Sequence, residues 1–377
     1  MKRFLVGLLA LCMAFTLVAC GGGSTSTGGT STGAASTGAA STGGTESTTP
    51  DESTGGTDAQ SITVGVLIYK YDDTYISTVR TALEKYAAES DVAITLDMQD
   101  GQGNQATQND QLDVLLQKGV DALLINAVDA GSSQGLADKA IEAGVPFIFF
   151  NREPDHSVLV EEVDGEEELV GLFVGTTASE AGVMQGDLLA DVWEARPELD
   201  RNGDGTCQYV VFKGEPGNPE AEARTEYSVK QAEARGMTME DIQGQPEVAN
   251  WMTDQAQSKM EAILGAKEGQ IEAVFCNNDD MALGVIAALN SIGYNTGDDD
   301  DKWIPVIGVD ATNAGMEAVN SGKMYATVKQ DGDAMGKALI ATVVNAGTGK
   351  ALPYLEGTEY TLADDGASIR IPYSPVS

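Results

Sequence analysis

The chain has 377 residues, and its 58 acidic against 22 basic residues give a formal net charge of −36. A chain this acidic repels polyanions and shows no basic patch, which excludes nucleic acid as a partner. The roughly 317 residues after position 60 exceed what a single hydrophobic core usually holds, so the length predicts two domains.

The N-terminus has the features of an export signal. A basic start and a short apolar run over residues 4–18 predict a signal peptide that spans 1–19. Cys20 follows Leu-Val-Ala, which resembles the bacterial lipobox and predicts a lipid on this cysteine; an incidental cysteine after an ordinary signal peptide is the alternative. Residues 20–60 are rich in Gly, Ser and Thr and bury too little apolar surface to fold, so they predict a tether or a glycosylated stalk.

From residue 61 onward, apolar β-branched runs alternate with amphipathic stretches of helical length. The alternation is typical of parallel strands covered by helices on both faces. The predicted strands span 62–68, 92–98, 121–126, 145–150, 171–175, 207–212, 246–250, 272–276, 304–309 and 324–329. The predicted helices span 74–89, 107–118, 132–143, 178–194, 219–235, 253–265, 279–292, 311–321 and 332–346. So many strands are unusual in one open sheet, so we predict an α/β fold with two doubly wound, parallel-sheet lobes.

The sequence shows no catalytic machinery. His156 is the sole histidine, and there is no nucleophile elbow, phosphate-binding G-K-[ST] loop or C-x-x-C motif. The segment 101–106, Gly-Gln-Gly-Asn-Gln-Ala, superficially matches a dinucleotide fingerprint with Asp121 downstream, but it follows the second strand, and a plain strand-to-helix turn is the alternative. Cys207 and Cys276 lie in apolar runs and are expected to be buried thiols, with a disulfide between them as the alternative. We therefore predict that the protein is not an enzyme.

One stretch has the oxygen spacing of a calcium loop. An EF-hand loop supplies ligands from positions 1, 3, 5, 7 (by its carbonyl) and 9, with Gly at position 6. The corresponding residues here are Asp200, Asn202, Asp204, Thr206 and Gln208, with Gly205 at the turn. Position 12 is Val211 instead of Glu, so a remote carboxylate must complete the shell. Without one, Asn-Gly-Asp-Gly is an ordinary turn.

The first predicted strand ends in acids and aromatics that suit a sugar. Asp73 can accept hydrogen bonds from vicinal hydroxyls, and Tyr75 offers an aromatic face to the apolar side of a sugar ring. The alternative is a helix N-cap at Asp73 and half-buried packing at Tyr75.

Longer segments carry a family resemblance. The chain resembles the periplasmic galactose/glucose-binding proteins of ABC sugar importers from about residue 61 to 373. The matching segments are Tyr69-Lys-Tyr-Asp-Asp73, Asn109-Asp-Gln-Leu-Asp-Val-Leu-Leu-Gln-Lys-Gly119, Phe149-Phe-Asn-Arg-Glu-Pro154, Lys213-Gly-Glu-Pro-Gly217, Ala221-Glu-Ala-Arg224, Asn277-Asn-Asp279 and Gly308-Val-Asp310.

The resemblance implies two Rossmann-like lobes of the periplasmic binding protein type I, joined by three chain crossings near 145–147, 330–332 and 369–371. The N-terminal lobe is then expected over 61–145 plus 332–369, and the C-terminal lobe over 147–330 plus 371–377. A hexose is expected between them. The polar ligand positions implied are Asp73, Asn126, Arg224, Asn278 and Asp310, and the aromatic positions that sandwich the ring are Tyr75 and Trp251.

The chain departs from the family in its ligand positions. A family His is Asn218 here, the following Asp is Glu220, and an Asn near the hinge is Gln330; position 75 is Tyr where the family often has Phe. These departures leave the sugar open, with D-galactose and D-glucose expected by resemblance. The family also has a calcium loop at 200–208 with a distant Glu, which corresponds to Glu272, so the resemblance implies a structural Ca²⁺.

The expected function is therefore that of a monomeric, lipid-anchored binding protein on the outer face of the cytoplasmic membrane or in the periplasm. It would capture a monosaccharide by hinge closure and deliver it to the permease and ATPase of an ABC importer. A different sugar, or reporting of sugar to a chemoreceptor, remains an alternative. The effector domain of a sugar-responsive repressor is excluded by the lipobox and by the lack of a helix-turn-helix.

Overall fold

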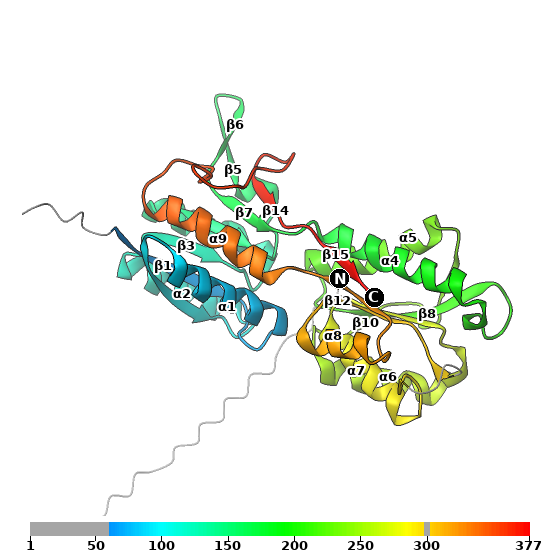
Figure 1. Cartoon of the computed structure of the whole chain (residues 1–377). Helices are drawn as coiled ribbons and strands as arrows, with labels where there is room; N and C mark the ends of the chain where they lie inside the picture. Colours follow the sequence, from blue (N-terminus) through cyan, green and yellow to red (C-terminus); the bar gives the residue numbers. More distant parts are fainter. Residues whose placement is uncertain (1–59, 298–301) are drawn as a thin grey trace, which may run out of the picture. The chain divides into compact units, whose positions relative to one another are not determined.

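The computed structural model describes residues 60–297 and 302–377 (Figure 1). The predicted signal peptide, Cys20 and tether lie outside these residues. None of the helices in the described part is both long enough and apolar enough to cross a membrane.

The first sheet has six strands in the order β14-β7-β4-β3-β1-β2, and all its pairs are parallel. Its strands are β1 (Ser61–Ile68), β2 (Ala93–Asp100), β3 (Ala122–Ile125), β4 (Phe147–Phe150), β7 (Leu172–Gly175) and β14 (Ser368–Arg370). The helices of this lobe are α1 (Thr74–Glu89), α2 (Gln105–Lys118), α3 (Ser133–Ala143) and α9 (Gly332–Gly347).

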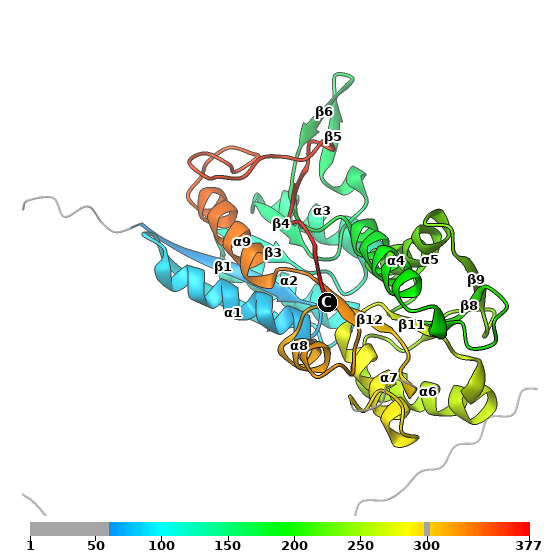
Figure 2. The ribbon, with the colours of Figure 1, turned by 45° about the vertical axis from the view of Figure 1, so that its right-hand side comes forward.

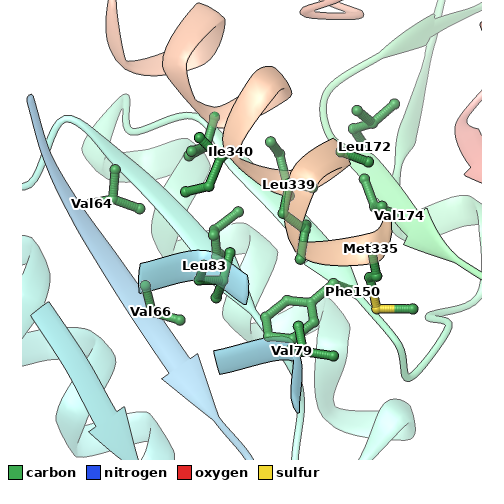
Figure 3. Packing of buried hydrophobic residues seen from close by; sticks show 14 of the residues in the cluster. Val64, Val66, Val79, Leu83, Phe150, Leu172, Val174, Met335, Leu339 and Ile340 are labelled. Atoms are coloured by element: carbon green, nitrogen blue, oxygen red, sulfur yellow. The ribbon is translucent and has the colours of Figure 1, made fainter. Parts of the chain in front are cut away.

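Apolar side chains cover both faces of this sheet. On one face, β1 and β4 pack against α1 and α9, and Figure 3 shows Val64, Leu83 and Leu339 meeting in this layer. On the other face, Leu123 and Phe149 pack with residues of α2 and α3. Strands buried on both faces carry uninterrupted apolar runs, which is why the sequence revealed them.

The second sheet has the order β10-β8-β11-β12-β13-β15, with β9 paired to β8. Its strands are β8 (Thr206–Lys213), β9 (Thr238–Asp241), β10 (Glu247–Val248), β11 (Ala273–Cys276), β12 (Val306–Asp310), β13 (Ala326–Lys329) and β15 (Ser374–Val376). Only β15 runs antiparallel to its partner among the described pairs of this sheet. The helices are α4 (Ala178–Ala195), α5 (Pro219–Ala234), α6 (Thr253–Lys267), α7 (Asp279–Ser291) and α8 (Asn313–Asn320). Short 3-10 turns span Ala130–Ser132, His156–Val158, Pro197–Leu199 and Glu268–Gln270.

The lobe boundary expected at 145–147 is wrong. Strands β4 and β7 both belong to the first sheet, where Ile148 pairs with Leu172. The first crossing therefore lies between β7, which ends at Gly175, and α4, which begins at Ala178. Lobe membership depends on which strands pair, and pairing between distant segments is not encoded in either segment alone.

A hairpin of β5 (Val160–Val163) and β6 (Glu166–Leu169) was not predicted. Its cross-strand neighbours include Glu161 opposite Glu168 and Glu162 opposite Glu167, and like charges in such positions are unfavourable. Figure 2 shows the hairpin standing clear of the neighbouring elements. The acidic sequences of both strands lack the apolar alternation by which strands are recognised, so the sequence pattern did not predict this hairpin.

Candidate ligand-binding site

A cavity of about 340 Å³, counting space open to solvent, lies beyond the carboxyl ends of the strands of both sheets. This is where ligands bind in open α/β sheets. The lining residues are Tyr69, Asp73, Tyr75, Ile76, Asn151, Arg152, Asn218, Glu220, Arg224, Trp251, Asn278, Asp310 and Gln330.

The predicted ligand positions converge on this cavity, with the exception of Asn126. That side chain is fully buried behind the cavity wall. Its amide donates to the carbonyl of Phe150 at 3.2 Å and to Asn151 Oδ1 at 3.2 Å, and its Oδ1 accepts from the backbone N–H of Tyr69 at 3.3 Å. Asn126 therefore ties together two segments that line the cavity, and in this structure it does not reach the cavity itself.

Four lining residues were not among the predicted ligand positions: Tyr69, Ile76, Asn151 and Arg152. Tyr69 follows β1 directly and Asn151 follows β4 directly. A search for polar residues at strand ends would have found both. Arg152 lies over the ring of Tyr69, with the guanidinium carbon 3.6 Å from the ring centroid, and pairs with Glu215 at 2.8 Å.

Several site residues also begin helices. Asp73, Asn218 and Asn278 are the N-caps of α1, α5 and α7, and each accepts a hydrogen bond from a backbone N–H three residues ahead. Each of these three side chains therefore both caps a helix and lines the cavity. Capping fixes each carboxylate or amide in place, which pre-orders the cavity wall.

The two aromatic positions come from different lobes. Tyr75 lies in α1 of the first lobe, and its hydroxyl donates to Met335 Sδ at 3.6 Å. The hydroxyl that distinguishes Tyr75 from the family's Phe is therefore engaged with α9. Trp251 lies between β10 and α6, and its backbone is in the left-handed region at φ 66°. A Cβ at Gly214 would lie 2.3 Å from the indole, so only glycine allows this ring its place.

Arg224 is the most heavily anchored side chain of the site. Its guanidinium donates to the carbonyl of Asn277, to Gln330 Oε1 and to the hydroxyl of Tyr373, each at 2.8 Å. Thr176 also donates to the Tyr373 hydroxyl at 2.8 Å. Thr176, Gln330 and Tyr373 lie in the three crossing segments, so Arg224 connects the cavity to all of them.

Several buried polar atoms of the cavity wall have no partner. They are Glu220 Oε2, Arg224 Nε, Trp251 Nε1 and Gln330 Nε2. Burial raises the pKa of Glu220, and it raises the pKa of Asp310 well above its usual range; the Arg224 guanidinium opposes both shifts. Because unpartnered buried groups are costly, a wall that keeps both donors and acceptors free is suited to a ligand that supplies both.

The predicted calcium loop folds around its own side chains. The Asp200 carboxylate accepts from the backbone N–H groups of Gly203 and Gly205 at 2.8 and 2.9 Å. Asp204 Oδ2 accepts from the amides of Asn202 and Gln208 at 2.9 and 3.0 Å. These contacts bring the predicted oxygen-bearing groups close to one another, as a hard cation requires.

Glu272 lies beside this loop although it is distant in the sequence. Its carboxylate accepts from the backbone N–H groups of Arg201 at 2.7 Å and Gln208 at 3.1 Å, and burial raises its pKa. The described residues contain no group of three or more acidic, His or Cys side chains arranged to hold a metal. A calcium ion here would therefore need the amide and carbonyl oxygens as well as the carboxylates, and the donor set contains them.

Two other sequence predictions concern groups outside the site. Cys207 and Cys276 are buried free thiols, as predicted. The glycine-rich segment at 101–106 is a strand-to-helix turn in which Asn104 caps α2.

Comparison with known proteins identifies the family. Residues 64–351 match the model of the periplasmic binding protein domain. The chain belongs to this family. The D-galactose/methyl-galactoside binding periplasmic protein of Haemophilus influenzae is 38% identical over 82% of this chain and 88% of its own length. The ribose import binding protein of Bacillus subtilis is 26% identical over 74% of this chain and 79% of its own length.

Solved structures agree with this assignment. An ABC transporter solute-binding protein from Bacillus halodurans with bound myo-inositol has a TM-score of 0.67 and 26% identity, and covers 85% of this chain and 96% of its own. An Actinobacillus succinogenes protein with bound D-allose has a TM-score of 0.68 at 20% identity, which supports the fold alone. The chain thus has the periplasmic binding protein type I fold and is a binding protein of the ABC-importer kind, not an enzyme.

Proposed function

We propose that this protein captures a monosaccharide, with D-galactose and D-glucose as the expected ligands, and delivers it to the permease and ATPase of an ABC importer. The observation that carries the proposal is the set of unpartnered donors and acceptors in a cavity that also holds Tyr75 and Trp251. Sugar hydroxyls both donate and accept, and aromatic faces suit the apolar side of the ring. The 38% identity to a D-galactose/methyl-galactoside binding protein supports this choice of sugar.

The second candidate function is binding of a different sugar, and three residues of the cavity wall favour it. Asn218, Glu220 and Gln330 depart from the family pattern and all line the cavity. Glu220 and Gln330 are each one methylene longer than the family's Asp and Asn, and each leaves a buried polar atom free. Relatives of this chain include binding proteins named for ribose and rhizopine.

The Ca²⁺ site is also a proposal. The loop 200–208 and Glu272 would hold the ion, because carboxylates and amide groups occur together there, and the Thr206 carbonyl is the further ligand that we expect. A bound ion would cross-link the start of β8 to the residue before β11. The role expected of it is stabilisation of the second lobe rather than contact with the sugar.

We also propose where the protein is located and that it is a monomer. A lipid on Cys20 would hold the protein at the outer face of the membrane, with 20–60 as the tether and the body as a monomer. Mass spectrometry of the protein from its native membrane tests the anchor.

A thermal-shift screen against monosaccharides, followed by calorimetric titration, tests the sugar. A ligand at 100 times its dissociation constant adds about 2.7 kcal/mol of stability. For a folded body of this size, this corresponds to a melting-temperature rise of roughly 4 °C. We expect D-galactose or D-glucose to give the largest rise. A larger rise with ribose or myo-inositol would establish the second candidate, and no rise with any sugar would contradict the proposal.

A further inference from the structure

A second cavity adjoins the proposed sugar site, and three residues line both cavities. It measures about 610 Å³, counting space open to solvent, and the shared residues are Tyr69, Asp73 and Trp251. The other lining residues are Lys70, Asp72, Asn250, Met252, Thr253, Asp254 and Asp280. We call this space the outer pocket and the sugar cavity the inner cavity.

The segment Asn250–Trp251, which contributes Trp251 to the lining of both cavities, is held by hydrogen bonds. Asn250 and Trp251 both have left-handed backbone conformations, at φ 49° and 66°, and the Asn250 amide donates to Gln255 Oε1 at 2.9 Å. The Trp251 carbonyl accepts from Asn278 at 3.3 Å. Strained backbone held by its surroundings is typical of functional sites. Trp251 lines both cavities, so its side chain can contact an occupant of either one.

The outer pocket is acidic. Its walls include Asp72, Asp73, Asp254 and Asp280, while its lysine, Lys70, pairs with Asp72 at 3.1 Å. Asp280 accepts from the hydroxyl of Thr74 in the other lobe at 2.6 Å. These groups accept hydrogen bonds from hydroxyl or amino groups, and they repel anions.

We propose that the outer pocket is a subsite for the substituent of a glycoside whose sugar ring occupies the inner cavity, and that it selects neutral or cationic, hydrogen-bond-donating substituents over anionic ones. The proposal rests on the proposed function, because it needs a sugar in the inner cavity. The outer pocket lies on one side of the inner cavity.

The test uses size-matched glycosides of whichever hexose binds, D-galactose or D-glucose. The 2-aminoethyl, 2-hydroxyethyl and carboxymethyl glycosides, each as both anomers, are titrated calorimetrically against the free sugar and the full-length protein. For one anomer we expect the aminoethyl and hydroxyethyl glycosides to bind within tenfold of the free sugar, and the carboxymethyl glycoside at least tenfold more weakly than either.

The Asp254→Asn variant should reduce the ratio of aminoethyl to carboxymethyl affinity at least threefold. Asp138→Asn is the matched control, because Asp138 is an exposed carboxylate of α3 that lines neither cavity, and it should leave the ratio unchanged. The melting temperature of each variant shows whether it is folded, and Asp72→Asn replaces Asp254→Asn if that variant is not.

The outcomes are distinguishable. If the free sugar binds but all glycosides of both anomers bind more than a hundredfold more weakly, the subsite is wrong and the proposed function stands. Equal affinity for the carboxymethyl and aminoethyl glycosides, or an unchanged ratio in the variant, also overturns the subsite. If no sugar binds, the proposed function and the subsite fall together.

Discussion

Some side chains of the cavity wall are anchored by hydrogen bonds to the protein and still keep one polar atom without a partner. Arg224 is held by three hydrogen bonds to protein groups, yet its Nε has no partner. The planar guanidinium can be fixed on one side and still offer a directed donor on the other. The Gln330 amide is likewise anchored by one atom only: its Oε1 accepts from Arg224, while its Nε2 has no partner. We infer that such anchoring lowers the ordering cost of binding.

Trp251 should report binding. Trp251→Ala removes the aromatic wall, so sugar affinity should fall at least tenfold, which corresponds to about 1.4 kcal/mol. The change in tryptophan fluorescence on titration should disappear with it. The control is Trp303→Phe, since Trp303 packs against Tyr325 and does not line the cavity. Unchanged sugar affinity in Trp251→Ala would remove this residue from the site.

At the scale of elements, buried carboxylates hold strands and helices of the second lobe together. Asp279 begins α7 and accepts from Thr327 of β13 at 2.6 Å and from the backbone N–H of Thr312 at 2.8 Å. A Cβ at Gly308 or Gly315 would lie 2.4 or 2.1 Å from its oxygens. Burial raises the pKa of Asp279 from 3.8 to about 6. The folded protein therefore binds this proton more tightly than the unfolded chain.

This shift predicts a pH dependence. Between about pH 4 and 6 the folded state binds more protons at Asp279 than the unfolded state, so its contribution to stability falls as pH rises through this window. Asp279→Asn should therefore lose more stability at pH 4 than at pH 7, with a difference of up to about 3 kcal/mol. Urea unfolding at both pH values measures it. The exposed Asp138→Asn should show no such difference, and an equal loss at both pH values would contradict the shift.

The loop 200–208, proposed to bind calcium, contacts a carboxylate that is distant in the sequence, that of Glu272. If Glu272 closes a Ca²⁺ shell, a chelator should lower the melting temperature of the wild-type protein, while sugar affinity should change far less. Glu272→Gln should abolish the chelator effect and weaken calcium binding, measured by calorimetry. Untouched calcium affinity and melting temperature in this variant would show that the site is wrong as described.

For the whole molecule, two contacts bridge the lobes on the walls of the cavities. Thr74 donates to Asp280, and Arg152 pairs with Glu215 while it stacks on Tyr69. The first contact is a part-buried hydrogen bond to a carboxylate and the second involves a buried arginine, and a hydrogen bond to a charged group contributes about 1.5–3 kcal/mol. We therefore expect these contacts to favour closure, and the ligand to add its own preference for the closed arrangement. Three crossing segments restrict the motion to bending about one axis.

Closure can be measured by small-angle scattering. Saturating sugar should decrease the radius of gyration, because the ligand stabilises the closed arrangement. The double variant Asp280→Ala, Glu215→Ala should need severalfold more sugar to reach the same closed form. Glu359→Ala, which breaks an exposed pair with Lys337 within one lobe, should behave as the wild type. A tightly bound sugar that left the radius unchanged would rule out closure as the mechanism.

The order and type of most elements could be predicted from local sequence patterns. Every predicted strand and helix occurs in the structure within a few residues of its expected bounds, because burial periodicity and caps such as Asp73 and Asn278 are local signals. The ligand positions that the family resemblance implied also meet at the cavity, with the exception of Asn126. Polar residues that follow parallel strands meet at one edge of a sheet.

Features that depend on contacts between distant segments could not be predicted and were seen first in the folded structure. It placed β4 and β7 in the first sheet, put Asn126 behind the cavity wall and brought Tyr373 to Arg224. It also revealed which polar atoms of the wall lack partners. Strand pairing and hydrogen-bond satisfaction are properties of the assembled chain, since each requires a partner that no local pattern specifies.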